Sequence, residues 1–325
     1  MIKMRWLFRI QFLLLLSLPF AGIGQQKDTL VKKLDSLSRK TDSAGKQSNN
    51  ISQKAYNDNT SFTFKSYFQL LGDDLKQEFT KPFHMKGKDW ARLAKFSVVA
   101  VGVGFADEPI QRNMVELTAK HSGIRKLSST ITKFGGTYEI YTLAAFGTYG
   151  VIFNNDKMKT TTLLATQAFI AGGAVESVTK YLTGRTRPSA YGPNTESEPK
   201  FYGPFSKTAR NINGAKEYSS FPSGHTTVAF AAATVFAKEY SNTVYVPIIA
   251  YSAATLIGLS RLTENKHWAT DVLVGAGLGY LSGNLVVNNY HRYAKLKAPN
   301  QPKNSVSFNL DYRFGHVMPG MIYSF

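Results

Sequence analysis

The chain has no cysteine among its 325 residues. This absence excludes disulfide bonds, a thiolate metal site, a cysteine nucleophile and a lipidated N-terminal cysteine. Reactive groups must therefore come from side chains that carry oxygen or nitrogen. Six histidines are present, and histidine is the side chain best suited to proton transfer near neutral pH.

Acidic residues are scarce: the chain has 21 Asp and Glu and 39 Lys and Arg, which gives a formal net charge of +18. Removing Lys3, Arg5 and Arg9 with an N-terminal leader, which has no acid before residue 25, lowers the charge by three to +15. Such a charge suits phosphates, anionic lipid head groups or nucleic acid. The basic residues are spread along the chain without a nucleic-acid module, so we expect no nucleic acid partner. A solvated basic surface accounts for most of the charge.

The N-terminus has the layout of a signal peptide, which we assign to residues 1–24. A basic region comes first, residues 10–20 form a short apolar core, and small residues precede a cut at Gln25. The alternative is an uncleaved anchor, but this core is shorter than the ~20 residues that cross a bilayer. In both cases the chain is expected to be exported to the cell envelope.

The remaining sequence divides by composition. Residues 25–60 are polar and are expected to be a flexible spacer with at most a short helix. Residues 61–90 mix aromatic and charged side chains, which is typical of an amphipathic flank packed on the core or lying on a membrane surface. Residues 91–297 carry the apolar segments and form the expected catalytic domain, and residues 298–325 form a tail.

Six apolar segments rich in Ala, Gly, Val, Leu and Thr predict an all-α fold built as a six-helix bundle. Gly275, Gly279 and Gly283 recur every fourth residue, so we expect another helix to approach their backbone closely. Residues 154–156 (Asn-Asn-Asp) predict a turn. The apolar segments lie near residues 91–106, 138–153, 161–182, 225–240, 243–260 and 270–288.

Two stretches outside these segments have their own patterns. Residues 189–221 form a long connection with three prolines, three glycines and several tyrosines. Long irregular connections are often functional, so we expect a lid. Residues 306–314 alternate strictly between apolar and polar side chains, which predicts a terminal strand or β-hairpin appended to the bundle.

Three motifs supply the groups needed for phosphoryl transfer. Their cations, Lys180, Arg187 and Arg261, can neutralise phosphoryl oxygens, and the arginines offer forked donors. Ser223 and the backbone N–H of Gly224 open a helix, where anions bind. Arg185 is a further candidate phosphate contact. The motifs are Lys180-x6-Arg187-Pro188, Pro222-Ser223-Gly224-His225 and Ser260-Arg261-x5-His267-x3-Asp271.

The two motif histidines have different expected roles. His267 and Asp271 are four residues apart at a helix start, so Asp271 can accept the Nδ1 proton and leave Nε2 free to attack phosphorus. His225 can protonate the leaving oxygen and later activate water. Alone, a His-x3-Asp pair is usually structural and a Pro-Ser-Gly string is an ordinary turn and cap, but their joint occurrence favours a phosphate site. The other histidines are expected to be surface or packing residues: His84, His121, His291 and His316.

The three motifs together resemble those of the type 2 phosphatidic acid phosphatase (PAP2) superfamily, which includes lipid phosphatases, soluble bacterial acid phosphatases and vanadium haloperoxidases. All eleven motif identities are present, and the resemblance covers roughly residues 91–290. It implies a phosphoric monoester hydrolase with His267 as nucleophile, Asp271 as its orienter and a phosphohistidine intermediate. No clustered carboxylates indicate magnesium or calcium, so neither a metal nor another cofactor is expected. Residues 262–266 are more polar than in many members.

The motifs all fall at one end of the expected bundle, and the number of membrane crossings decides which side that end faces. If all six segments cross the membrane and the chain begins outside the cytoplasm, the site faces the cytoplasm. Segment 91–106 has only about 14 apolar residues, and five crossings would turn the site outward. A soluble periplasmic bundle is the alternative, favoured by Glu139, Gln167 and Glu176 within the segments. We expect a membrane-embedded or membrane-associated protein whose site faces the periplasm.

The sequence leaves four functions in competition. The first is a metal-independent phosphatase acting on a phosphomonoester or pyrophosphate of a lipid, with a membrane as partner. The others are a soluble acid phosphatase of broad specificity on small phosphate esters, a vanadate-dependent haloperoxidase and a non-catalytic envelope scaffold. The complete catalytic set favours an enzyme, and no protein partner is indicated.

Overall fold

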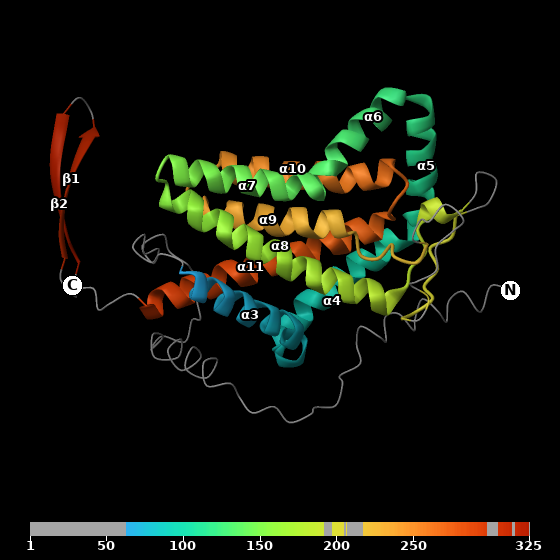
Figure 1. Ribbon diagram of the computed structural model, residues 1–325, viewed down its shortest axis with the longest axis horizontal. Helices are drawn as coiled ribbons and strands as arrows, with labels where there is room; N and C mark the ends of the chain where they lie inside the picture. The colour runs from blue at the N-terminus through green and yellow to red at the C-terminus, as the bar shows by residue number, and fades with distance from the viewer. Residues whose placement is uncertain are drawn as a thin grey trace.

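The computed structural model describes residues 63–191, 197–204, 206, 217–297, 305–313 and 316–324. These residues form nine α-helices, three short 3-10 helices and two strands (Figure 1). The predicted signal peptide and the spacer lie outside the described residues, as does much of the predicted lid. The α-helices are α3 (Phe64–Thr80), α4 (Gly87–Phe105), α5 (Asp107–Lys120), α6 (Ser122–Ile131), α7 (Thr137–Ile152), α8 (Asp156–Thr183), α9 (Gly224–Glu239), α10 (Tyr245–Thr263) and α11 (Ala269–Lys297).

Helix α9 lies at the centre of the bundle, in contact with α8, α10 and α11 (Figure 1). Its sequence is rich in Ala and Thr, whose small side chains let neighbouring helices come close. Ala231 and Val235 are fully buried and meet Leu164 of α8 and Val286 of α11 in the main core. Burial of these apolar side chains is the main term that holds the helices together.

Helices α9 and α11 pack along the three glycines. A Cβ added at Gly279 would lie 2.2 Å from the carbonyl oxygen of Thr227, and one at Gly283 would lie 2.5 Å from that of Ala231. Gly275 faces the carbonyl oxygen of Ser223 in the same way, at 2.7 Å. The predicted close approach is therefore confirmed. Since contacts advance along both helices together, α9 and α11 run parallel and begin at the same end of the bundle.

Both ends of α8 are set by local backbone chemistry. The predicted turn before it is confirmed: Asn154 has a positive φ of 49°, and the Asn155 side chain accepts a hydrogen bond from Met158 N at 2.9 Å. At the other end Gly184 has φ 53°, a left-handed conformation that favours glycine. The chain turns there into the loop that carries Arg185 and Arg187.

Each predicted apolar segment coincides with one α-helix to within two residues at the segment's ends, or lies inside it: α4, α7, α8, α9, α10 or α11. The predicted count of six is too low for the described residues, because α3, α5 and α6 are helices as well. Helices α5 and α6 escaped prediction because only one side of each packs on the bundle, so they contain no apolar run. Helix α3 falls in the predicted flank, and α4 begins before the predicted boundary at residue 90.

Near the C-terminus two strands, β1 (Ser305–Arg313) and β2 (His316–Ser324), pair antiparallel. The register runs from Ser305 opposite Ser324 to Arg313 opposite His316.

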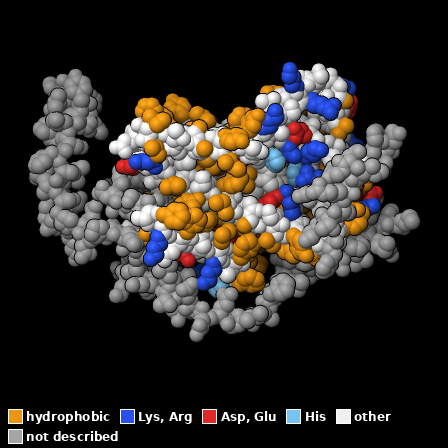
Figure 2. Space-filling model, in the orientation of Figure 1, with side chains coloured by type: hydrophobic (Ala, Val, Ile, Leu, Met, Phe, Trp, Pro, Cys, Tyr) orange, Lys and Arg blue, Asp and Glu red, His pale blue; other side chains and the backbone are white. Residues whose placement is uncertain are grey.

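Large apolar side chains are exposed along the sides of the bundle. Figure 2 shows hydrophobic side chains gathered over its middle, and Ile152 of α7 and Tyr245 of α10 are 69% and 77% exposed. Among the described helices, α10 and residues Ala269–Ala294 of α11 are long and apolar enough to cross a membrane. In these two stretches only 28% and 44% of the residues are buried.

Candidate active site

The predicted site residues come together at one end of the bundle, beside α5 and α6. Figure 2 shows Lys, Arg and His side chains gathered at this end. Because α9 and α11 both begin here and α8 and α10 both end here, four helix ends meet. Lys180 lies in the last turn of α8, Arg187 in the next loop, Ser223, Gly224 and His225 at the start of α9, Arg261 near the end of α10, His267 just before α11, and Asp271 in the first turn of α11.

The motif cations are held in place by neighbouring acceptors. Arg187 donates from Nε to Ser219 Oγ at 3.2 Å, from Nη2 to the Ser219 carbonyl at 3.1 Å, and from Nη1 to the Lys266 carbonyl at 3.3 Å. Arg261 pairs with Glu264, and Lys180 pairs with Glu176 one turn earlier on α8. Since protein acceptors set their positions, a phosphate would meet preorganised charges.

The start of α9 leaves its backbone open to the site. A Cβ added at Gly224 would lie 2.5 Å from Glu176 Oε1 and 3.2 Å from Lys180 Nζ, so no side chain fits there. Ser223 is fully buried, and its backbone N–H donates to the Asp271 carbonyl at 3.0 Å. This contact ties the starts of α9 and α11 together.

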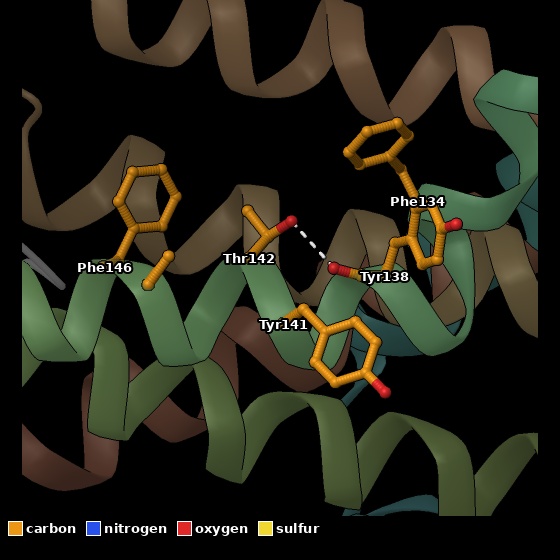
Figure 3. A pocket seen from close by; sticks show the side chains of 6 residues that line it. Phe134, Tyr138, Tyr141, Thr142 and Phe146 are labelled. Atoms are coloured by element: carbon orange, nitrogen blue, oxygen red, sulfur yellow. Dashed lines mark hydrogen bonds between the residues drawn. The ribbon is translucent and has the colours of Figure 1, made fainter.

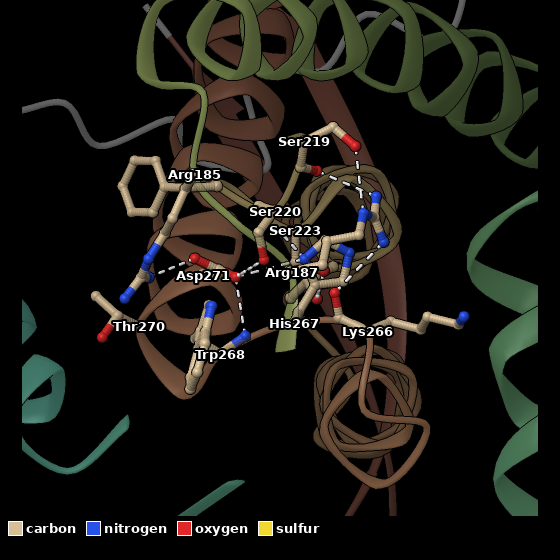
Figure 4. A network of polar contacts seen from close by, with 12 residues as sticks. Arg185, Arg187, Ser219, Ser220, Ser223, Lys266, His267, Trp268, Thr270 and Asp271 are labelled. Atoms are coloured by element: carbon tan, nitrogen blue, oxygen red, sulfur yellow. Dashed lines mark hydrogen bonds and ion pairs between the residues drawn. The ribbon is translucent and has the colours of Figure 1, made fainter. Parts of the chain in front are cut away.

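His267 is buried, and its Nδ1 lies 2.7 Å from the Ser220 carbonyl oxygen (Figure 4). A carbonyl oxygen only accepts, so Nδ1 carries the proton and Nε2 keeps its lone pair. The expectation that Asp271 accepts this proton is wrong in this geometry, since Asp271 Oδ2 is 3.6 Å from Nδ1. Oδ2 instead accepts from Ser220 Oγ at 2.5 Å and from Trp268 N at 2.8 Å.

Arg185 is not a phosphate contact, contrary to the sequence-based expectation. Its side chain is 4% exposed, and its Nη1 and Nη2 donate to Asp271 and Asp107, each at 2.6 Å. The rings of Phe201 and Trp268 flank the guanidinium at 4.8 and 5.6 Å. Both amino groups are therefore taken up by carboxylates.

Sequence reasoning missed three residues that shape the site. Glu176 could have been found, because it lies four residues before Lys180 on one helix and such pairs attract. Asp107 gave no signal, since it reaches the site from a segment far away in the sequence. Ser220 lies two residues before Pro222 of the second motif, but it contacts His267 through its backbone carbonyl, which residue type does not reveal.

Both motif histidines are kept neutral by their surroundings. Burial, and then repulsion by Arg187, Lys180 and Arg261, hold the pKa of His267 well below its usual value. Burial and the same cations lower the pKa of His225 to about 3. A bound phosphate would oppose these cations, so it would raise the pKa of both histidines.

An open aromatic pocket adjoins the site along α7. Phe134, Tyr138, Tyr141 and Phe146 line it (Figure 3). Gly136, between the first two of these residues, touches His225, because a Cβ added there would lie 3.1 Å from His225 Nε2. Two of the lining residues, Phe134 and Tyr138, are therefore two residues along the chain from a glycine that contacts the motif histidine.

Comparison with known proteins finds relatives that share the region of the three motifs. The model of the PAP2 superfamily matches residues 161–295, which include all three motifs. A 68-residue stretch is 48% identical to a lipid A 1-phosphatase of Porphyromonas gingivalis, covering 21% of this chain and 15% of that one. A 75-residue stretch is 37% identical to a probable diacylglycerol pyrophosphate phosphatase 1 of Schizosaccharomyces pombe, covering 19% of this chain and 27% of that one. The chain thus spans under a third of the length of either curated relative.

Two solved structures are also similar. One is a transmembrane PAP2-type phosphatidylglycerolphosphate phosphatase from Bacillus subtilis, at 25% identity and a TM-score of 0.44, covering 60% of this chain and 92% of that one. The other is LpxE of Aquifex aeolicus, at 22% identity and a TM-score of 0.41, covering 55% and 93%.

The helical bundle gathers fixed cations and two neutral histidines at one end, an arrangement that suits an anion such as phosphate. Over residues 161–295, which hold all three motifs, the chain is similar to the PAP2 superfamily.

Proposed function

We propose that the protein is a phosphatase that hydrolyses a phosphomonoester or pyrophosphate through a phosphohistidine at His267. The observation that carries the proposal is the state of His267. Its Nδ1 is engaged by the Ser220 carbonyl at 2.7 Å, which leaves Nε2 as a nucleophile. Lys180, Arg187 and Arg261 lie close enough to lower its pKa, so they also lie close enough to attract a phosphoryl group.

The proposed reaction has two halves. In the first, Nε2 of His267 attacks phosphorus, the bond to the leaving oxygen breaks, and His225 gives that oxygen a proton. In the second, water attacks phosphorus and gives a proton to His225, and the phosphorus–nitrogen bond breaks to release phosphate. The three cations and the α9 N-terminus balance the negative charge on the phosphoryl oxygens in both halves. Because side chains supply this charge, we propose that no metal is needed.

We further propose that the substrate is a lipid. The curated relatives are named for phosphate removal from lipid A and from diacylglycerol pyrophosphate. The aromatic pocket beside His225 and the exposed apolar sides of the bundle suit an acyl chain and a bilayer. A soluble acid phosphatase of broad specificity would use the same catalytic residues, and it is the alternative.

We also propose that the chain is exported by the signal peptide at residues 1–24 and that the site faces the periplasm. In this arrangement α10 and α11 cross the membrane, within a core made of α4 and α7 to α11, and the C-terminal β-hairpin is an appendage. The basis is the leader pattern together with the length and composition of the two helices.

The experiment that tests this function is phosphate release by purified wild type, His267→Ala and His84→Ala. Substrates are p-nitrophenyl phosphate, phosphatidic acid, undecaprenyl diphosphate and a lipid A phosphate, each with EDTA present. Wild type and His84→Ala, whose changed residue is exposed and outside the motifs, should release phosphate. His267→Ala should not, because it lacks the nucleophile.

Each other outcome has a definite meaning. Activity abolished by EDTA contradicts the metal-free reaction, and activity only on p-nitrophenyl phosphate favours the soluble acid phosphatase. If wild type is inactive on all four substrates, the result contradicts the phosphatase proposal. Halide oxidation with added vanadate is then measured, to test the haloperoxidase alternative.

A further inference from the structure

A buried group of charges lies behind His267, on the side away from the motif cations. Arg185 bridges two carboxylates, Asp271 of α11 and Asp107 at the start of α5 (Figure 4 shows its bond to Asp271). Both carboxylates are fully buried, and Arg185 is 3% exposed. Burying three charges is costly unless they are paired and hydrogen-bonded, so an arrangement of this kind needs a reason.

Asp107 is held on both of its oxygens. Oδ1 accepts from the backbone N–H of Thr270 at 2.9 Å, and Oδ2 accepts from Thr270 Oγ1 at 2.7 Å as well as from Arg185. Thr270 is adjacent to Asp271 in the first turn of α11. Asp107 therefore fastens α5 to the same turn that carries the motif carboxylate.

An unbroken chain of short hydrogen bonds runs from Asp107 to the nucleophile. Arg185 joins Asp107 to Asp271, Asp271 Oδ2 accepts from Ser220 Oγ at 2.5 Å, and the Ser220 carbonyl accepts from His267 Nδ1 at 2.7 Å. Asp271 accepts from Arg185 on Oδ1 and from Ser220 and Trp268 on Oδ2, so donors hold both of its oxygens. Its carboxylate cannot rotate without breaking several of these bonds.

We propose that Asp107 and Arg185 are positioning residues for His267, acting through Asp271 and Ser220. By occupying Nη2 of Arg185, Asp107 fixes the plane of the guanidinium, and Nη1 then holds the Asp271 carboxylate in the orientation that binds Ser220. The Ser220 carbonyl is thereby kept where it sets the tautomer and the ring angle of His267. This inference rests on the proposed function, since it assigns a role in the same reaction.

Two features separate this role from substrate binding. Arg185 has both amino groups on carboxylates and an aromatic ring on either side. Its remaining donor, Nε, has no partner among the described residues and is buried. Lys180, Arg187 and Arg261 do not contact Asp107 or Arg185 by any hydrogen bond or ion pair among the described residues. Loss of Asp107 should therefore impair the chemical step while leaving phosphate affinity nearly unchanged.

The test compares Asp107→Asn, Arg185→Lys and Thr270→Val with wild type in detergent. Glu239→Gln is the matched control, because Glu239 is also a buried carboxylate, paired with His291 at 2.9 Å at the other end of the bundle. Measured quantities are kcat, KM, inhibition by inorganic phosphate, the pH dependence of kcat/KM and the midpoint of thermal unfolding.

Asp107→Asn should lower kcat by about 10- to 100-fold, as expected when a nucleophile is slightly misplaced. Its KM and its inhibition by phosphate should stay within about threefold of wild type, because the motif cations are intact. The acid limb of kcat/KM should move to lower pH, because the loss of one negative charge lowers the pKa of His267 further. The other charged groups that face His267 are unchanged: Lys180, Arg187, Arg261 and Asp271. Arg185→Lys, which cannot reach both carboxylates in forked geometry, should lower kcat in the same way, but it keeps its charge and should leave the acid limb in place.

A residue with a purely structural role would, when changed, lower the unfolding midpoint but leave the acid limb of kcat/KM in place. We expect this result for Glu239→Gln. The same result for Asp107→Asn overturns the proposal. So does a raised KM with unchanged kcat. If Asp107→Asn fails to fold, Thr270→Val decides, because it keeps both charges and removes one bond to Asp107. A folded Thr270→Val with wild-type kcat contradicts the proposal, and a several-fold loss supports it.

Failure of the underlying function looks different. If His267→Ala keeps wild-type rates, the phosphohistidine reaction itself is wrong. If His267→Ala is inactive and Asp107→Asn equals wild type in kcat and in its pH limb, only the positioning role is lost.

Discussion

The residues of the site show how burial and charge set the state of two imidazoles. His225 lies against Gly136, which has no side chain to fill the space beside Nε2. Burial and the cations Arg261, Lys180 and Arg187 lower its pKa to about 3, so the ring is neutral in the free protein at neutral pH. A general acid must carry a proton. A bound phosphate dianion would allow His225 to be protonated, because its negative charge offsets the cations and raises the pKa of His225.

His225→Ala should therefore spare binding and impair protonation of the leaving group. We expect losses of about 10²- to 10⁴-fold in kcat for alkyl phosphates, whose leaving oxygen needs a proton, and much smaller losses for aryl phosphates. Steady-state kinetics with both ester types, and inhibition by vanadate as a check of the intact pocket, measure this. Equal losses on the two ester types would remove His225 from the acid role.

At the scale of elements, the contact between α9 and α11 sets the geometry of the site. The two helices approach through glycines, and their parallel course puts Ser223 and Asp271 in contact. Any side chain on this face of α11 would meet backbone atoms of α9, which cannot rotate away as a side chain can.

Gly279→Ala should destabilise the fold by roughly 1–3 kcal/mol, because the new Cβ would lie 2.2 Å from the Thr227 carbonyl oxygen. Gly102→Ala is the matched control, because a Cβ at this helical position of α4 meets nothing within 4 Å. It should be neutral or stabilising through helix propensity. The midpoints of chemical or thermal unfolding compare the two, and equal midpoints would mean that the helices can separate at little cost.

Helix α3 docks on α11 through two carboxylates, the buried Asp74 and the half-buried Glu78. Asp74 accepts from Asn289 at 2.7 Å, and Glu78 accepts from Ser282 at 2.5 Å. Burial raises the pKa of Asp74 to about 7; the nearby Glu78 and Asp73 add to this and the Asn289 hydrogen bond opposes it. Because the folded state holds this proton more tightly, its stabilising contribution is full below about pH 4 and is lost as pH rises through about 7.

Asp74→Asn should remove this pH dependence, since the amide keeps an acceptor for Asn289 and does not ionise. The variant should match wild type near pH 5 and unfold at a higher temperature than wild type at pH 8. Thermal unfolding and hydrogen exchange of residues 64–80 measure the effect. Glu116→Gln, at an exposed carboxylate, should follow wild type at both pH values. A wild-type pH response in Asp74→Asn would show that α3 does not depend on this proton.

At the scale of the whole molecule, the site end and the opposite end of the bundle are chemically distinct. The site end carries cations and histidines beside α5 and α6, and apolar side chains are exposed along the sides (Figure 2). The absence of cysteine makes the orientation in a membrane easy to measure, because a single introduced thiol labels without background.

Ser122→Cys and Asn242→Cys place an exposed thiol at opposite ends, at the start of α6 and between α9 and α10. An impermeant maleimide applied outside the inner membrane should label Ser122→Cys, and Asn242→Cys only after the membrane is permeabilised. Both variants should retain phosphatase activity, which confirms that they are folded. The reverse pattern would turn the site to the cytoplasm, and labelling of both would indicate a soluble periplasmic protein.

Prediction from sequence succeeded where a pattern is local. The long helices follow from apolar runs, the turn at Asn154 from residues that tolerate a positive φ, and the α9–α11 contact from glycines at every fourth position. It failed for α5 and α6, whose apolar residues face only one side. It also failed for Arg185, because the sequence around this residue does not reveal that its side chain contacts two carboxylates, Asp107 and Asp271.

The sequence by itself determined the helical class, the motif residues and the resemblance to the PAP2 superfamily, because each depends on residue types at fixed spacing. Only the tertiary structure decided what holds His267. Asp271 lies close by in the sequence but 3.6 Å from Nδ1, whereas the Ser220 carbonyl, distant in the sequence, accepts the proton at 2.7 Å. The reason is physical: a hydrogen bond depends on distances within a few tenths of an ångström, and packing of α5, α9 and α11 sets those distances.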